Sequence, residues 1–389
     1  MAIPIVDSHI HLFPESHLPT LAWYDPDGPL ASQHSIDEYR IATVSSSPSP
    51  DSSQSTYLRG FIFLETDRIS AVDEESGKCW SHALDEVSLL ARIIVGTPIP
   101  GEGHREDDHR LCLGFVPWAP VPGGPVALER YLALVKERTG TEEVWNKVRG
   151  VRYLVQDKPA GVMLQSDFIE GLKWLGRQRL TFDLGVDARQ GGLWQLREAV
   201  DMLRRVYEGT DNEKESNIIF IIGMASTKCH SSWLSLLLMN LSPDHLCKPN
   251  LRLPYSASSE SLTTHPDFVE WKSLVATMAQ YPTTYMKLSG GFSELPHLSS
   301  ASEPDIPALV ERLRPWTDVI FDAFGPQRVM FGSDWPVCNV GGGGNEAAWR
   351  RWKCVVEEVL ERRGLNEEQR RGVWGQVAVN AYGIDISTA

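Results

Sequence analysis

The chain has 389 residues, enough to bury a large core, and its hydrophobic content of 42% is ordinary for a globular protein. Its formal net charge of −14 argues against a nucleic-acid or anionic-membrane partner, because both require clustered lysine and arginine. The six cysteines lie far apart without a CxxC pair, and the N-terminal MAIPIVDSHIHLFP lacks the basic segment of a signal peptide. We therefore expect a reduced, cytoplasmic protein that acts on a small molecule; its oligomeric state stays open.

Eight short apolar runs with β-strand character recur along the chain. In order, they are IPIV (3–6), GFIFLE (60–65), LCLGFV (111–116), GVRYLV (150–155), LTFDLGV (180–186), NIIFII (217–222), TYMKLS (284–289) and RVMFGS (328–333). Near-continuous apolar strands are what a parallel sheet covered on both faces requires. The runs therefore predict eight parallel strands.

Helical periodicity fills several of the intervals between these runs. The clearest case is 193–206, where apolar residues recur at a spacing of three or four, and 347–360 and 308–324 behave likewise. Pro315 is expected to break or kink the last of these helices. Strand–helix alternation repeated eight times predicts an α/β protein, a single (β/α)₈ TIM barrel over residues 1–389.

Three segments exceed a minimal barrel and are predicted as insertions. Residues 45–56 (SSSPSPDSSQST) are rich in Ser and Pro, and residues 97–110 are rich in Pro, Gly, His and acidic side chains. Both compositions favour surface loops. The third segment, 223–243, follows the sixth run and is considered below.

His9 and His11 stand two positions apart at the end of the first run. Side chains at this spacing on a strand point to the same side, and at the carboxyl end of a barrel strand that side is the active-site mouth. Two convergent imidazoles there suit a divalent metal ion or an oxyanion. A pair of structural histidines is the competing interpretation.

Asp334 follows the eighth run, in the segment FGSDWP (331–336). A carboxylate at this rim can bind a metal ion or deprotonate a water molecule. The competing interpretation is an N-cap for the next helix, because Asp is favoured there. Asp334 alone leaves both interpretations open.

The order of these motifs is more specific than either of them. It is carried by VDSHIHLFP (6–14), GFIFLETD (60–67), RGVRYLVQ (149–156), LTFDLGV (180–186), DHLCKP (244–249), YMKLSGGFSE (285–294) and FGPQRVMFGSDWPV (324–337). The series spans nearly the whole chain and resembles the amidohydrolase superfamily. Within its amidohydrolase-related branch, the chain resembles the lactonase-like group. That group includes sugar-acid lactonases of the L-rhamnono-γ-lactonase and L-fuconolactonase type, and 2-pyrone-4,6-dicarboxylate lactonase.

This resemblance implies roles for four residues. His9 and His11 become candidate ligands of a metal ion or of the substrate, and Asp334 becomes the general base. His245, in DHLCKP, becomes a further catalytic imidazole. A divalent cation, zinc before others, is the implied cofactor.

The chain departs from the family pattern at the fifth strand. Many amidohydrolases bring a histidine from that strand, whereas LTFDLGVD offers Asp183 and Asp187. A full zinc site, a weak metal site completed in part by Glu65, and the absence of a metal therefore all stay open. For Glu65 the competing interpretation is a salt bridge at the rim.

Five further side chains are candidates for binding the substrate. Lys287 on the seventh strand and Arg152 on the fourth carry charges suited to a lactone carbonyl or a carboxylate, and structural ion pairs are the competing interpretation. Trp335, Tyr153 and Trp23 are candidate walls for a compact sugar ring, with ordinary core packing as the alternative.

Residues 223–243 (GMASTKCHSSWLSLLLMNLSP) separate NIIFII from DHLCKP, which directly follow one another in the resembling families. Removing these twenty-one residues would leave the remaining sequence in frame. One hypothesis is a native rim loop with an apolar centre, and the other is translated intron sequence. Exposed apolar residues of this kind favour aggregation.

The leading functional prediction is hydrolysis of a small, sugar-derived lactone to its hydroxy acid, with Asp334 as the base. GxSxG, P-loop and GxGxxG motifs are absent, which argues against serine-esterase and nucleotide chemistry. The enzymatic alternative is a metal-dependent, non-oxidative decarboxylase of the same branch. The non-enzymatic alternative is an inactive barrel disabled by 223–243.

Overall fold

The computed structural model describes residues 2–44, 56–72, 78–188, 192–208, 218–223, 251, 260–293, 295, 298 and 303–385. His245 and most of the 223–243 segment lie outside these residues, as does most of the 45–56 segment. Within the described part of the chain, no helix has both the length and the apolar character that crossing a membrane requires.

Each of the eight predicted runs overlaps a strand. The strands are β1 (Ile3–Ile10), β2 (Thr56–Leu64), β3 (Cys112–Val116), β4 (Gly150–Arg152), β5 (Thr181–Gly185), β6 (Phe220–Gly223), β7 (Thr284–Leu288) and β8 (Val329–Phe331). They pair in parallel in chain order, β1 to β3 in one sheet and β4 to β8 in a second.

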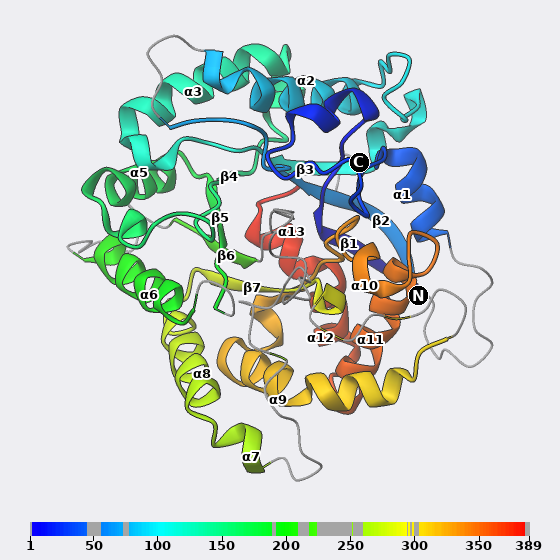
Figure 1. The fold of residues 1–389 in the computed structure, drawn as a ribbon, viewed down its shortest axis with the longest axis vertical. Coiled ribbons are helices and arrows are strands. Elements are labelled where there is room, and N and C mark those ends of the chain that lie inside the picture. Colours follow the sequence, from blue (N-terminus) through cyan, green and yellow to red (C-terminus); the bar gives the residue numbers. More distant parts are fainter. Residues whose placement is uncertain are drawn as a thin grey trace.

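Backbone hydrogen bonds join the two sheets at both edges. Between β3 and β4, the amide of Phe115 donates to Lys147 (2.8 Å) and the amide of Arg149 donates to Phe115 (3.0 Å). Between β8 and β1, the amide of Asp334 donates to His9 (2.8 Å). The strands therefore form the predicted (β/α)₈ barrel, and Figure 1 shows the helices around its outside.

The helices cover the barrel in chain order. They are α1 (Ile36–Thr43), α2 (Ser81–Val95), α3 (Gly124–Thr139), α4 (Glu142–Trp145), α5 (Ser166–Arg177), α6 (Trp194–Tyr207), α7 (Glu260–Thr263), α8 (Pro266–Met278), α9 (Ile306–Phe324), α10 (Asn339–Gly342), α11 (Ala348–Arg362), α12 (Glu367–Arg371) and α13 (Val377–Ala381). The helices predicted at 193–206 and 347–360 are confirmed as α6 and α11.

Of the two outcomes expected at Pro315, the break does not occur, because α9 continues through this residue. Proline removes one backbone hydrogen bond inside a helix. The apolar face of α9, with Leu313, Trp316 and Ile320, is buried against its neighbours α8 and α11. Tertiary packing of that face outweighs the missing hydrogen bond.

The 97–110 segment is more structured than the loop that its composition predicts. It contains a 3₁₀ helix, Glu106–Arg110, and three of its polar side chains are buried. Glu102 pairs with Arg92 and accepts a hydrogen bond from His104, and Asp108 pairs with Arg40. Ion pairs between these buried carboxylates and partly exposed arginines of α1 and α2 therefore hold this insertion.

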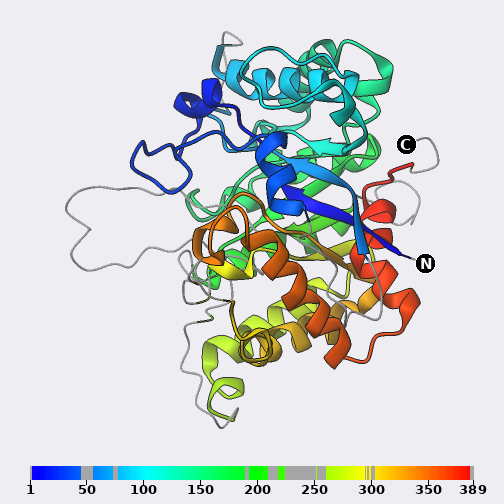
Figure 2. The same cartoon turned by 90° about the vertical axis from the view of Figure 1, so that its right-hand side faces the viewer.

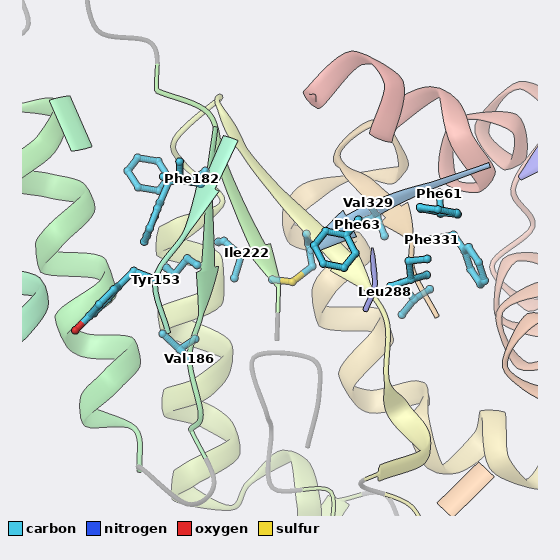
Figure 3. Close-up of a cluster of buried hydrophobic side chains, with 14 of the residues drawn as sticks. Phe61, Phe63, Tyr153, Phe182, Val186, Ile222, Leu288, Val329 and Phe331 are labelled. Atoms are coloured by element: carbon cyan, nitrogen blue, oxygen red, sulfur yellow. The ribbon is translucent and has the colours of Figure 1, made fainter. Parts of the chain in front are cut away.

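Apolar side chains occupy two layers on either side of the strands. The larger layer lies between the barrel and its helices and includes Phe182, Ile222 and Phe331 (Figure 3). The smaller layer lies inside the barrel, where Val6, Leu113, Ile221 and Met330 pack against residues of α13. In Figure 2, α13 (red) lies on the side of the barrel where the N-terminus lies. This helix therefore closes the floor of the barrel, opposite the carboxyl ends of the strands.

Candidate active site

His9, His11 and Asp334 meet at the carboxyl ends of β1 and β8. The Nε2 atoms of His9 and His11 are 3.2 Å apart, and they lie 3.0 Å and 3.2 Å from Oδ1 of Asp334. All three residues are buried. The structure thus brings together the three residues that the two sequence motifs singled out.

Backbone geometry at the barrel seam positions this cluster. Asp334 follows β8 with a φ of 59°, in the left-handed region that Asp tolerates better than most residues. Its amide donates to the carbonyl of His9, and the amide of His11 donates to that of Trp335 (2.7 Å). The seam between β8 and β1 therefore fixes the carboxylate beside both imidazoles.

A buried carboxylate, Asp7, holds the seam from below. It accepts hydrogen bonds from the Tyr39 hydroxyl (3.0 Å), the Trp349 indole (2.8 Å) and the Ser333 amide (2.8 Å). Burial raises the pKa of Asp7, while these hydrogen bonds lower it. Asp7 therefore ties β1 to the segment that carries Asp334.

Both histidines present their Nε2 atoms to the cluster. Nδ1 of His11 lies 3.0 Å and 2.9 Å from the carbonyl oxygens of Leu64 and Glu65. A ring proton on Nδ1 leaves the Nε2 lone pair for a ligand. Burial lowers the pKa of His9 well below its usual range, against the opposing effect of Asp334.

The donor set fits a divalent cation. Zinc is held by His nitrogen and carboxylate oxygen at ~2.0–2.2 Å, so two ligands of a tetrahedral site are about 3.3 Å apart. The three donor atoms of His9, His11 and Asp334 lie 3.0–3.2 Å from one another. Three protein ligands leave a fourth position for water or substrate, which is the arrangement of catalytic zinc sites.

A small cavity opens beside this cluster. It is lined by His11, Phe13, Trp23, Glu65, Thr66, Asp67, Arg152, Leu154 and Val337. The Trp23 indole donates to the carbonyl of Thr66 (2.9 Å), and its ring packs edge-on against Phe13. Two of the predicted substrate-binding residues, Trp23 and Arg152, therefore lie in the same cavity as a predicted metal ligand.

Glu65 faces Arg152 and the backbone of the next loop, apart from the three-residue cluster. Its Oε1 lies 3.6 Å from Nε of Arg152, and its Oε2 accepts from the amide of Asp67 (2.5 Å). Burial raises the pKa of Glu65 to about 8, although the Arg152 guanidinium opposes the shift. Glu65 thus lies beside Arg152, and the cluster of possible metal ligands among the described residues contains His9, His11 and Asp334.

The pKa of Glu65 predicts a pH-dependent free energy of unfolding. Between about 4.5 and about 8 the folded protein keeps a proton that the unfolded chain has released. Stability therefore falls as pH rises through this window, by up to about 1.4 kcal/mol per pH unit. Urea denaturation between pH 5 and pH 8 would measure the free energy of unfolding of Glu65→Gln and of the parent. The stability of Glu65→Gln relative to the parent should increase as the pH rises. The exposed Glu129→Gln serves as control, and a parallel pH profile for parent and Glu65→Gln would contradict the prediction.

Lys287 and Asp183 form an ion pair in the interior of the barrel. Nζ of Lys287 lies 2.5 Å from Oδ1 of Asp183, and both side chains are buried. The Tyr382 hydroxyl donates to both oxygens of Asp183 at 2.9 Å. The structural ion pair that competed with substrate binding for Lys287 is therefore present, and it lies close to the cluster.

Two predicted aromatic walls lie elsewhere. Trp335 is fully buried, packs against His34 and Tyr39, and donates to Asn345 (2.7 Å). It belongs to the core behind the cluster, which was the alternative interpretation. Tyr153 lines a second cavity of ≈ 340 Å³ that shares Asp67 and Leu154 with the first.

Sequence reasoning missed two residues that support the site, Asp7 and Tyr382. Asp7 precedes the HxH motif by two positions on the same strand. An acidic residue there was a usable signal. Tyr382 follows α13, and nothing in its local sequence indicates that it reaches Asp183.

The comparisons with known proteins agree with these observations. The chain is 32% identical over 385 residues to L-rhamnono-gamma-lactonase of Scheffersomyces stipitis, covering 98% of both proteins. It is 26% identical over 240 residues to L-fucono-1,5-lactonase of Burkholderia multivorans, covering 61% of this chain and 64% of that protein.

A crystal structure of an amidohydrolase from Burkholderia multivorans with bound zinc shares the fold. Its TM-score is 0.61 at 23% identity, with 98% of this chain and 99% of that chain covered. The family model described as amidohydrolase matches residues 253–384, which include Lys287, Asp334 and Tyr382. The full-length similarity, the barrel and the His9–His11–Asp334 cluster lead to one conclusion: the chain belongs to the amidohydrolase family.

Proposed function

We propose that this protein hydrolyses a sugar-derived lactone to its hydroxy acid. The observation that carries the proposal is the convergence of His9, His11 and Asp334 at the mouth of the barrel. Full-length similarity to a rhamnonolactonase supports hydrolysis over the decarboxylation that the same branch also performs.

Asp334 acts as the base in this proposal. It takes a proton from a water molecule, whose oxygen adds to the lactone carbonyl carbon. The bond between that carbon and the ring oxygen then breaks, and Asp334 returns the proton to the leaving oxygen. A divalent cation, zinc before others, held by His9, His11 and Asp334, would supply Lewis-acid polarisation of the carbonyl.

Charged and aromatic side chains beside the cluster bind and orient the lactone. Arg152 and Trp23 line the same cavity as His11 and suit the hydroxyl groups and the apolar face of a sugar ring. Tyr153 provides a wall of the adjoining cavity. The Lys287 ammonium, buried near His9 and Asp334, stabilises negative charge that develops on the carbonyl oxygen.

A panel of aldonolactones, assayed by acid release with and without chelator, tests the proposed function. Turnover of at least one γ- or δ-lactone, reduced by chelator and restored by zinc, is expected. Release of carbon dioxide from aromatic or enoic acids, without lactone turnover, would favour the decarboxylase. An inert protein would favour the inactive barrel.

The intron hypothesis for 223–243 makes its own prediction. Gly223 pairs with Gly185 at the end of β6, so we define the deletion as 224–243. If the segment is foreign, deletion should raise soluble yield, melting temperature and lactonase activity together, because an apolar loop is lost and His245 moves next to β6 in sequence. Lower activity or stability after deletion would instead identify the segment as native.

A further inference from the structure

Three side chains from distant parts of the chain form a hydrogen-bonded series inside the barrel. Tyr382 donates to Asp183 on β5, and Asp183 accepts from Lys287 on β7. The Lys287 ammonium also lies over the ring of Tyr382, with Nζ 5.4 Å from the ring centroid. All three residues are at most 2% exposed. Tyr382 thus contacts both members of the buried ion pair.

Lys287 can donate more hydrogen bonds than the described residues accept from it. An ammonium group carries three N–H donors. Among the residues that the structure describes, Asp183 is its single hydrogen-bond partner. Leaving donors of a buried charge without partners is costly, so a ligand that accepts from them would be bound favourably. Within the described residues, the series therefore ends in a cation with one hydrogen-bond acceptor.

The cation is close enough to the catalytic cluster to act on it. Strand β7 lies beside β8 in the barrel, and a Cβ atom at Gly332, just after β8, would meet both His9 and Ser289, two residues after Lys287. In the strand register Lys287 is level with Met330 on β8, below the rim where Asp334 stands. Lys287 therefore lies beneath the cluster, and Asp183 and Tyr382 hold it there.

The C-terminal part of the chain brings Tyr382 into this position. Val377, Ala378 and Ala381 of α13 pack against inward-facing residues of the strands, such as Val6 and Met330. Tyr382 follows directly after α13 and extends the same cluster toward Asp183. In Figure 1, α13 is drawn among the strands, and the residue that follows it reaches the ion pair beneath the reaction centre.

We propose that Tyr382 is a positioning residue of the active site, which acts through Asp183 to hold the Lys287 ammonium beneath the His9–Asp334 cluster. Its hydroxyl lies 2.9 Å from both oxygens of Asp183 and so fixes the orientation of the carboxylate that Lys287 contacts. The ring gives the ammonium a second favourable contact, a cation–π interaction. The consequence for turnover rests on the proposed function.

A double-mutant cycle tests whether Tyr382 acts through Lys287. Tyr382→Phe removes the hydroxyl and keeps the ring beneath the ammonium. We expect it to lower kcat by about 10- to 100-fold, the loss of one hydrogen bond to a charged group, and to leave KM within about twofold. In a Lys287→Met background, the same substitution should lower kcat no further.

Tyr131→Phe is the matched control. Tyr131 is also fully buried, on α3, and its hydroxyl has no hydrogen-bond partner in the described part of the chain. This variant should keep the parent kcat. If Lys287→Met does not fold, Lys287→Gln replaces it in the cycle. Equal losses of kcat from Tyr382→Phe in both backgrounds, or parent kcat in Tyr382→Phe, would overturn the inference.

The same double-mutant cycle can be measured as free energies of unfolding in urea, and this measurement does not depend on the substrate. Tyr382→Phe should destabilise the parent more than it destabilises the Lys287 variant, because the two side chains are coupled through Asp183. A parent protein without lactonase activity would contradict the proposed function alone. Additive effects on unfolding would overturn the positioning role whether or not the parent turns over.

Discussion

Asp334→Asn should reduce kcat by at least ~10³-fold while the protein stays folded, because it removes the base that accepts the proton from water. Asn is isosteric with Asp and tolerates the left-handed φ of 59° at this position equally well. Asp334 is also the residue that both Nε2 atoms approach, so the variant should bind a divalent cation more weakly. Steady-state kinetics on the best aldonolactone and thermal unfolding would measure both effects.

Asp334→Ala separates the chemical role from the structural one. Neither alanine nor asparagine carries a side-chain carboxylate. Alanine is in addition strained at positive φ and leaves a gap beside two buried imidazoles. Both variants should lose turnover, and the alanine variant should also melt at a lower temperature. Parent-like kcat in Asp334→Asn would show that another group is the base.

Joint replacement of His9 and His11 by alanine should remove bound divalent metal and abolish measurable turnover. Two of the three donor atoms in the cluster are lost, and one carboxylate oxygen alone is a weak site for zinc. Metal content after dialysis and lactone kinetics would be measured on the same preparation. The proposed metal site would be wrong if the double variant kept the parent's metal content and activity.

His34→Ala is the matched control for this experiment. His34 is buried, its Nδ1 lies 2.8 Å from a backbone carbonyl, and burial lowers its pKa. Like the cluster histidines it is buried, but it packs against Phe13 and Trp335 instead. The control should lose stability through its cavity and keep bound metal, so loss of metal in this variant would indicate a general effect of unfolding.

The apolar runs and the helical periodicity between them, repeated in order along the chain, were sufficient to predict the barrel. Each apolar run became a strand because both faces of a parallel barrel strand are buried, so local composition carries the signal. His9, His11 and Asp334 were found for a related reason: each stands next to a strand end, and strand ends converge at one mouth. Pro315 does not end α9, because the packing of this helix outweighs a local preference.

Contacts between distant segments were decided by tertiary structure alone. Glu65 was a candidate metal ligand from its place beside β2, yet Arg152 on β4 lies next to its carboxylate. Trp335 stands beside Asp334 in sequence, but its ring turns into the core against His34. Within a strand, a shift of one residue moves a side chain to the opposite side of the sheet. Trp335 lies in the turn after β8, where spacing along the sequence does not fix the direction of a side chain.

The sequence by itself determined the eight-strand barrel, the family resemblance and the identity of the three residues at its mouth. Only the tertiary structure decided how those residues are supported: Asp7 beneath the seam, and Lys287, Asp183 and Tyr382 in the interior. The physical reason is separation along the chain. Tyr382 and Asp183 are 199 residues apart, and a hydrogen bond at that distance leaves no periodic signal in either local sequence.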